Sequence, residues 1–272
     1  MLSETMAIPL NFVDAPEFDR RLMSDAMLTL MAPWQWVAVG ICFVWSGFVR
    51  SGLGFGGAAL TLPMLLMINN DPLFYLPAIC WQLLFFSVLT VSTRWSNVNW
   101  QHVRHLCLLL FLPFAVGLFG LLNLSGSILS VFVYGTTLFY GCVYMLDKQM
   151  VSRSWYMDAL CLLGGGYASG VSLVGAPLIV AYSTRHLQAS QLRDTLFVIW
   201  IILVISKIST FMVAGVDLQW QLTLYTFPLV ALGHWLGLQA HRRLLSGNRK
   251  YFHRVIGSGL VGVSILGLWS GL

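Results

Sequence analysis

Charge is what this sequence has least of. Only 9% of its 272 residues are charged, against about 25% in a soluble globular domain, while 58% are hydrophobic. Most of the chain therefore has no aqueous surface to cover, which excludes a soluble enzyme or binding module. The net charge of +5 comes from basic residues in short stretches between apolar runs. That pattern is typical of membrane orientation and not of nucleic-acid binding.

The sequence also lacks cysteines at metal-binding spacing. All five lie within apolar runs, far from the pattern of a small disulfide-bonded secreted chain: Cys42, Cys80, Cys107, Cys142 and Cys161. They indicate small buried side chains, and we expect neither a metal nor a cofactor.

Residues 1–33 differ from the rest. Charged residues such as Asp14, Glu17 and Arg20 exclude the apolar core of a signal peptide there. We interpret this region as an extramembrane N-terminal arm.

Long apolar segments dominate the remainder and predict an all-α, polytopic membrane helix bundle. A span needs about 20 residues. Segments of that length are 74–92, 105–122, 127–145, 193–214 and 221–238, with 254–271 at marginal length. Four shorter pieces form two glycine-separated pairs, 34–49 with 56–68 and 155–171 with 175–184. Either pair, whether it spans twice or re-enters, adds no net crossing.

Basic residues occur in four of the connecting loops, around 93–104, 146–154, 185–192 and 242–254, and are absent from 69–73, 123–126 and 215–220. The positive-inside rule places the basic loops in the cytoplasm. This assignment predicts a cell inner-membrane protein with both termini extracytoplasmic. It also makes each half an odd number of crossings, so two similar halves would have opposite orientations.

The halves are similar. Ser51–Leu60 reads SGLGFGGAAL and Ser169–Leu178 reads SGVSLVGAPL, at a constant offset of 118 residues. We therefore predict two inverted transmembrane repeats, 34–147 and 148–272, each opening with a glycine-broken helix or helical hairpin. Small residues also recur in ordinary helix packing, which is the competing explanation. Inverted repeats with broken helices are a recurring plan of secondary transporters.

The breaks are candidate anion sites. A helix that restarts after glycines has unpaired N–H groups at its positive end, which bind anions. Pro63 and Pro177 would shorten or kink the following half-helices. Packing glycines with two kinks are the alternative. The predicted substrate-binding residues are Ser51, Gly52, Gly54, Gly56, Gly57, Gln82, Ser169, Gly170, Ser172, Gly175, Lys207 and Thr210.

Lys207 is the charge expected nearest to those breaks. It lies near the middle of 193–214, and no Asp or Glu lies deep in any span to pair with it. Intramembrane charges usually face a cavity or a partner, and a transported anion would be one; snorkelling to the headgroups is the alternative. Thr210 shares its helix face. Gln82 could bind substrate or bridge helices.

Three further residues have structural explanations of at least equal weight. Arg50 and Arg185 flank the breaks, where positive-inside anchoring accounts for them equally well. His234 is the only histidine deep in a span, and a satisfied core imidazole is the favoured interpretation over a proton relay.

The two runs GFVRSGLGFGGAALTLP (Gly47 to Pro63) and GGGYASGVSLVGAPLIV (Gly164 to Val180) resemble the paired signatures of the TauE/SafE sulfite-exporter family. The resemblance implies export of sulfite or small organosulfur anions such as sulfoacetate, without ATP. In the second copy Ser172 and Val174 stand where glycines are common.

We therefore expect a secondary exporter of small anions that works by alternating access and is not an enzyme. An anion channel is the first alternative. The second is an intramembrane serine hydrolase using Ser169 and His234, because Ser169-Gly170 resembles the G-x-S-G of rhomboid-type proteases. Tyr167 stands where the first glycine of that motif should be, and the repeat twin Ser51 has no corresponding histidine. The expected partners are the lipid bilayer and a small anion, with no nucleic acid; a homodimer stays open.

Overall fold

The computed structural model describes residues 28–53, 57–146, 150–244 and 249–271, and every named element in these ranges is a helix. The first half contains α2 (Pro33–Leu53), α3 (Gly57–Leu66), α4 (Pro72–Ser92), the 3-10 turn η1 (Trp95–Asn97), α5 (Trp100–Asn123) and α6 (Gly126–Met145). The second contains α7 (Trp155–Ser172), α8 (Ala176–His186), α9 (Ala189–Val213), α10 (Trp220–Leu244) and α11 (Arg249–Gly271).

Local side chains set several of the helix starts. Asp71 accepts a hydrogen bond from the Leu73 amide at the start of α4, at 2.9 Å, and Ser154 accepts one from the Met157 amide at the start of α7, at 3.3 Å. Both side chains satisfy amides that have no partner within the helix. Because each cap bonds an amide in the first turn, the apolar run that follows is helical from its start.

Four of the described helices, α4, α5, α6 and α9, have the length and composition to cross a membrane. On α5 the outward residues form an apolar stripe at helical spacing, with Leu108 78%, Phe111 73% and Phe119 69% exposed. Such a stripe would be costly in water, and lipid is the solvent that covers it without penalty. The all-α membrane bundle predicted from composition is thus the observed architecture.

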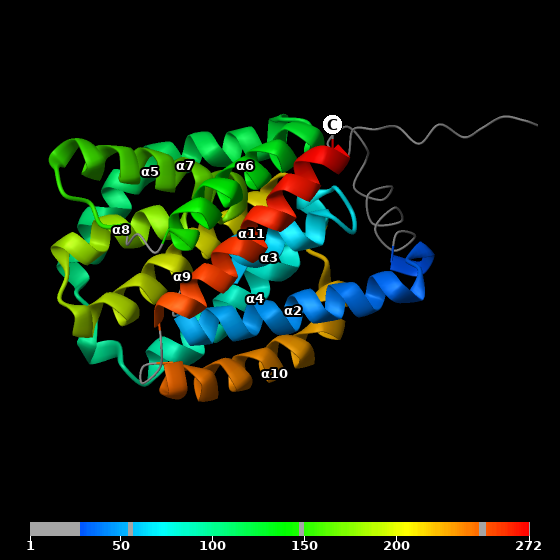
Figure 1. Cartoon of the computed structure of the whole chain (residues 1–272). Helices are drawn as coiled ribbons and strands as arrows, with labels where there is room; N and C mark the ends of the chain where they lie inside the picture. The colour runs from blue at the N-terminus through cyan, green and yellow to red at the C-terminus, as the bar shows by residue number, and fades with distance from the viewer. Residues whose placement is uncertain (1–27, 54–56, 147–149, 245–248, 272) are drawn as a thin grey trace, which may run out of the picture.

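The helices pack as pairs that join the two halves of the chain. Figure 1 shows α2 beside α10 along the lower edge and α5 beside α7 along the upper edge, while α4 contacts α9 and α6 contacts α11. Each of these four pairs takes one helix from each half. The start of α2 and the end of α11 lie at the same end of the bundle (Figure 1).

Glycines bring the outer pairs to backbone contact. A Cβ on Gly233 of α10 would lie 1.9 Å from the Val44 carbonyl oxygen of α2. In the α5–α7 pair, a Cβ on Gly117 would lie 2.3 Å from the Tyr167 carbonyl oxygen, and one on Gly170 would lie 2.3 Å from that of Phe114. Interfaces between membrane helices are typically rich in small residues, which allow the backbones to approach closely.

The two short helices are too short to cross. α3 has 10 residues and α8 has 11, which at about 1.5 Å per residue is half of a hydrocarbon core of about 30 Å. α7 and α8 are joined at Leu173–Gly175, where Leu173 adopts a left-handed backbone conformation (φ 60°). Gly175 packs so tightly on the Gly165 carbonyl oxygen that a Cβ would lie 2.0 Å from it. The chain therefore folds back on itself within the bundle at this point.

Residues 54–56, which join α2 to α3, lie outside the described residues, and with them the predicted break residues Gly54 and Gly56. The largest buried cluster of the described residues spans both halves. It joins α2, α3 and α4 to the end of α7 and to α9, with Phe43, Phe74 and Tyr75 among its largest side chains. We call α2 with α3 the first hairpin and α7 with α8 the second hairpin. The core of the molecule thus lies where the ends of these two hairpins meet the paired long helices.

Candidate functional site

A small cavity lies between the ends of the two hairpins. The first half lines it with Arg50, Gly57 and Ala58, and the second half with Ser169 and Ala176, while α9 closes it with apolar and aromatic side chains. Its volume is about 20 Å³, which is room for about one water molecule. In this conformation the cavity is therefore too small to hold anything larger than a water molecule.

Arg50 provides the charge of this cavity. It lies in the last turn of α2, is only 3% exposed, and its Nη1 donates a hydrogen bond of 3.0 Å to the Gln82 carbonyl oxygen of α4. Its guanidinium carbon is 5.3 Å from the centre of the Phe86 ring. The Nε atom is buried without a hydrogen-bond partner. No ion pair joins Arg50 to a carboxylate of the described residues, so the guanidinium retains hydrogen-bonding capacity for an anion.

Ser169 faces the same cavity from the opposite hairpin. Its hydroxyl oxygen is buried and has no partner among the described residues. A Cβ on Gly175 would lie 2.4 Å from that oxygen, so only glycine leaves the space beside it. The helix starts at Gly57 and Ala176 border the cavity as well. A buried arginine, a free hydroxyl and two helix starts are a chemically suitable set for an anion.

Lys207 is fully buried in α9, as its position in the sequence indicated, but it does not line the cavity. Its ammonium group donates a hydrogen bond to the Gly170 carbonyl oxygen, in the last turn of α7. Val204, one turn earlier on α9, does line the cavity. Lys207 therefore contacts the end of α7 from the side away from the cavity lining, through its hydrogen bond to the Gly170 carbonyl oxygen.

Ser51 is hydrogen-bonded to Nδ1 of His234, which links α2 to α10. The hydrolase alternative required His234 to pair with Ser169. That pairing is absent from the structure, because the close packing of α2 on α10 brings His234 to Ser51, and the Ser169 hydroxyl has no partner among the described residues.

Other predicted residues lie outside the cavity lining. Gln82 donates from Nε2 to the Thr226 hydroxyl of α10, at 2.7 Å. The backbone carbonyl oxygen of Gln82 accepts the hydrogen bond from Arg50. The Thr210 hydroxyl donates to the Ser206 carbonyl oxygen in its own helix, at 2.8 Å. Ser172 donates to the Ala168 carbonyl oxygen at 3.4 Å.

The two predicted prolines lie within the short helices. Pro63 lies inside α3. Pro177 lies in the first turn of α8, where a residue without an N–H leaves no helical hydrogen bond unmade. Gly52 lies in the last turn of α2.

Arg50 is the residue whose weight sequence reasoning underestimated. A signal was available in the sequence, because Arg50 directly precedes the first glycine-rich break. A second difference concerns carboxylates. α9 begins at Ala189, which makes Asp194 part of the helix, and Asp194 is 1% exposed with its Oδ2 accepting a hydrogen bond of 2.6 Å from Asn97.

The fold and the cavity define a multi-pass α-helical membrane protein with a cationic internal site. A family model described as sulfite exporter TauE/SafE matches residues 39–267. The chain belongs to this family of membrane transporters, as the two glycine-rich runs indicated. No curated protein and no solved structure matched the chain.

Proposed function

We propose that this protein is a secondary transporter that exports small inorganic or organosulfur anions, such as sulfite or sulfoacetate, across the inner membrane. The observation that carries the proposal is the buried guanidinium of Arg50 in a cavity between the ends of two hairpins. A charge in that position is expensive unless a partner shares it. The cavity lining contains no carboxylate, so an anion from solution is the natural partner.

In this proposal Arg50 and Ser169 bind the anion directly, and the helix starts at Gly57 and Ala176 border it. Lys207 contributes its field from behind the second hairpin. Glycines at the two hairpin ends let the backbone approach the anion closely. Substrate size is limited by the aromatic and aliphatic wall of α9, where Phe197 and Trp200 lie.

Two inverted repeats, 34–147 and 148–272, are the proposed basis of alternating access. The packing supports this, because exchanging the halves converts the α2–α10 pair into the α7–α5 pair and leaves the α4–α9 and α6–α11 pairs unchanged. The loop charges give the halves opposite orientations. The cavity then lies at the repeat interface, which is where transporters of this plan bind their substrates.

The small volume of the cavity favours a carrier over a channel. An anion larger than water can load only after the hairpins or the α9 wall move, as alternating access requires. The driving force for export would be the inside-negative membrane potential, about 2.3 kcal/mol per charge per 100 mV. An exported anion gains that energy directly, so no coupling ion is required.

Counterflow in proteoliposomes tests the carrier. Vesicles that contain the purified protein and a high concentration of unlabelled sulfite should transiently accumulate external radiolabelled sulfite, and the flux should saturate. Protein-free vesicles are the control. Flux that rises linearly with concentration and shows no counterflow would favour the channel. Absence of flux for sulfite, sulfoacetate and related sulfonates would refute the substrate class.

A further inference from the structure

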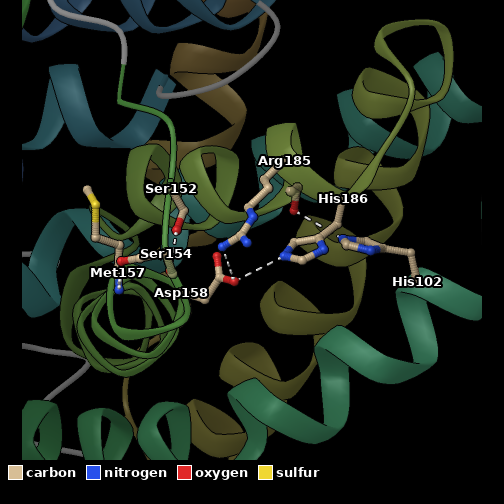
Figure 2. Close-up of polar contacts among 8 residues, drawn as sticks. His102, Ser152, Ser154, Met157, Asp158, Arg185 and His186 are labelled. Atoms are coloured by element: carbon tan, nitrogen blue, oxygen red, sulfur yellow. Dashed lines mark hydrogen bonds and ion pairs between the residues drawn. The ribbon is translucent and has the colours of Figure 1, made fainter.

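A cluster of charged side chains that the binding site does not use joins α7 to α8 at the open end of the second hairpin, away from the cavity. Asp158, in the first turn of α7, accepts a hydrogen bond of 2.9 Å from Nη1 of Arg185 and contacts Nε2 of His186 at 3.3 Å. Arg185 and His186 lie in the last turn of α8. Figure 2 shows the two basic side chains converging on the single carboxylate.

Neighbouring contacts support the same closure. The Ser152 amide, just before α7, donates to the Ala181 carbonyl oxygen of α8 at 3.2 Å. The His186 ring packs on Tyr182, with centroids 4.5 Å apart. His102 of α5 contacts the Ser183 hydroxyl at 3.2 Å (Figure 2). The open end of the α7–α8 hairpin is thus held together and to the start of α5.

The position of this cluster relative to the cavity suggests its role. Ser169 and Ala176 line the cavity at the closed end of the hairpin. Asp158 precedes Ser169 by 11 positions and Arg185 follows Ala176 by 9, or about 16 Å and about 14 Å along the two helices. The ion pair therefore lies at one end of the hairpin and the binding site at the other. The loop charges assign the ion-paired end to the cytoplasm.

Among the described residues, the first hairpin has no equivalent of this cluster. At the repeat offset of 118 residues, the positions of Asp158, Arg185 and His186 are occupied by Gly40, Met67 and Ile68. A fold requirement common to both hairpins would act on both sides of the membrane. A carboxylate with two basic partners, found on one side only in the described part of the chain, indicates instead a device that acts on that side.

We propose that Asp158, Arg185 and His186 form an ionic latch that restrains the α7–α8 hairpin and thereby limits cytoplasmic access to the cavity. The proposal rests on the proposed transport function and on the orientation given by the loop charges. Arg185 and Asp158 are 37% and 16% exposed, and a pair this accessible contributes at most about 1 kcal/mol. That is enough to bias an equilibrium between two accessibilities and too little to lock it.

A competing explanation is that each charge only stabilises its own helix end, since an acid suits a helix start and a base suits a helix end. A charge exchange separates the two explanations. In a His186→Gln background, Asp158→Arg with Arg185→Asp restores the pair but places both charges unfavourably for their helices. A latch predicts recovery in the double variant, whereas independent helix-end effects predict that it is worse than either single variant.

The measurement is the labelling rate of a single cysteine, Ala176→Cys, in a chain whose five native cysteines are replaced. A membrane-impermeant maleimide is applied to inside-out and to right-side-out vesicles. Asp158→Asn should accelerate labelling from the cytoplasmic side about two- to fivefold, with no acceleration from the other side, and the exchanged pair should return the rate toward the parent value. Arg153→Gln, which removes an exposed charge nearby, is the matched control.

An unchanged rate in Asp158→Asn, acceleration from both sides, or no recovery in the exchanged pair would overturn the latch. The labelling needs no substrate, so its outcome is independent of the flux assay. If the latch variants respond while sulfite flux is absent, the proposed function fails and the latch stands. If flux depends on Arg50 while labelling does not respond, the reverse holds.

Discussion

At the scale of single residues, the buried Arg50 and the buried Lys207 have different surroundings. Arg50 borders the cavity with its Nε unsatisfied, while Lys207 lies behind the second hairpin and bonds to the Gly170 carbonyl oxygen. Their contributions should differ for that reason. A charge that contacts the anion supplies a charge-assisted hydrogen bond, and a charge one layer away supplies only its field.

We expect Arg50→Gln to lower the sulfite flux by about tenfold to a hundredfold, since a hydrogen bond to a charged group contributes about 1.5–3 kcal/mol. Lys207→Met should lower it by less than about tenfold, because Met keeps much of the volume and removes only the distant charge. Flux per folded protein in proteoliposomes measures both, with the exposed Arg104→Gln as the control. A larger loss from Lys207→Met than from Arg50→Gln would contradict the assignment of the direct ligand.

The sequence alone identified part of this site. The repeated S-G-x-x-x-x-G-A-x-L run located Ser169, Gly57 and Gly175 at the two hairpin ends. It could not show that Gln82 bridges to Thr226, or that Thr210 bonds within its own helix. Helical spacing shows which residues share a face, and the neighbour of that face depends on tertiary packing, which no local pattern records.

At the scale of helices, the two halves meet backbone to backbone in the α2–α10, α5–α7 and α6–α11 pairs. Apolar runs predicted where nearly all the helices lie, because hydrophobic length is fixed by the bilayer. Helix ends were less accurate, as α5 begins at Trp100 and α10 continues to Leu244. Both helices continue through polar and basic residues beyond the apolar run. A prediction based on hydrophobic length assigns such residues to the loops. Which helices pair was not predictable, because it depends on how glycine faces fit together.

Gly233→Ala tests the α2–α10 contact. The added Cβ would lie 1.9 Å from the Val44 carbonyl oxygen, so the two backbones must separate, which we expect to cost about 1–3 kcal/mol. The matched control is Gly262→Ala in α11, where a Cβ meets nothing within 4 Å. Thermal unfolding in detergent should show a lower midpoint for the first variant and no loss for the second. Equal midpoints would show that this contact is not essential to the bundle.

At the scale of the whole molecule, the account describes a carrier that presents one cationic site to either side of the membrane in turn. The two halves pair helix for helix, and the cavity lies between the ends of their hairpins. In the described part of the chain, only the α7–α8 hairpin has a cluster of opposite charges at its open end. Such a carrier moves net charge when it moves an anion. Transport should therefore respond to the membrane potential.

The most direct test is sulfite efflux from proteoliposomes under a potassium diffusion potential set with valinomycin. The account predicts that an inside-negative potential accelerates efflux, that an inside-positive potential slows it, and that Arg50→Gln largely abolishes both the flux and its response. An efflux rate that is the same at every potential, or that persists unchanged in Arg50→Gln, would contradict electrogenic anion export through this cavity.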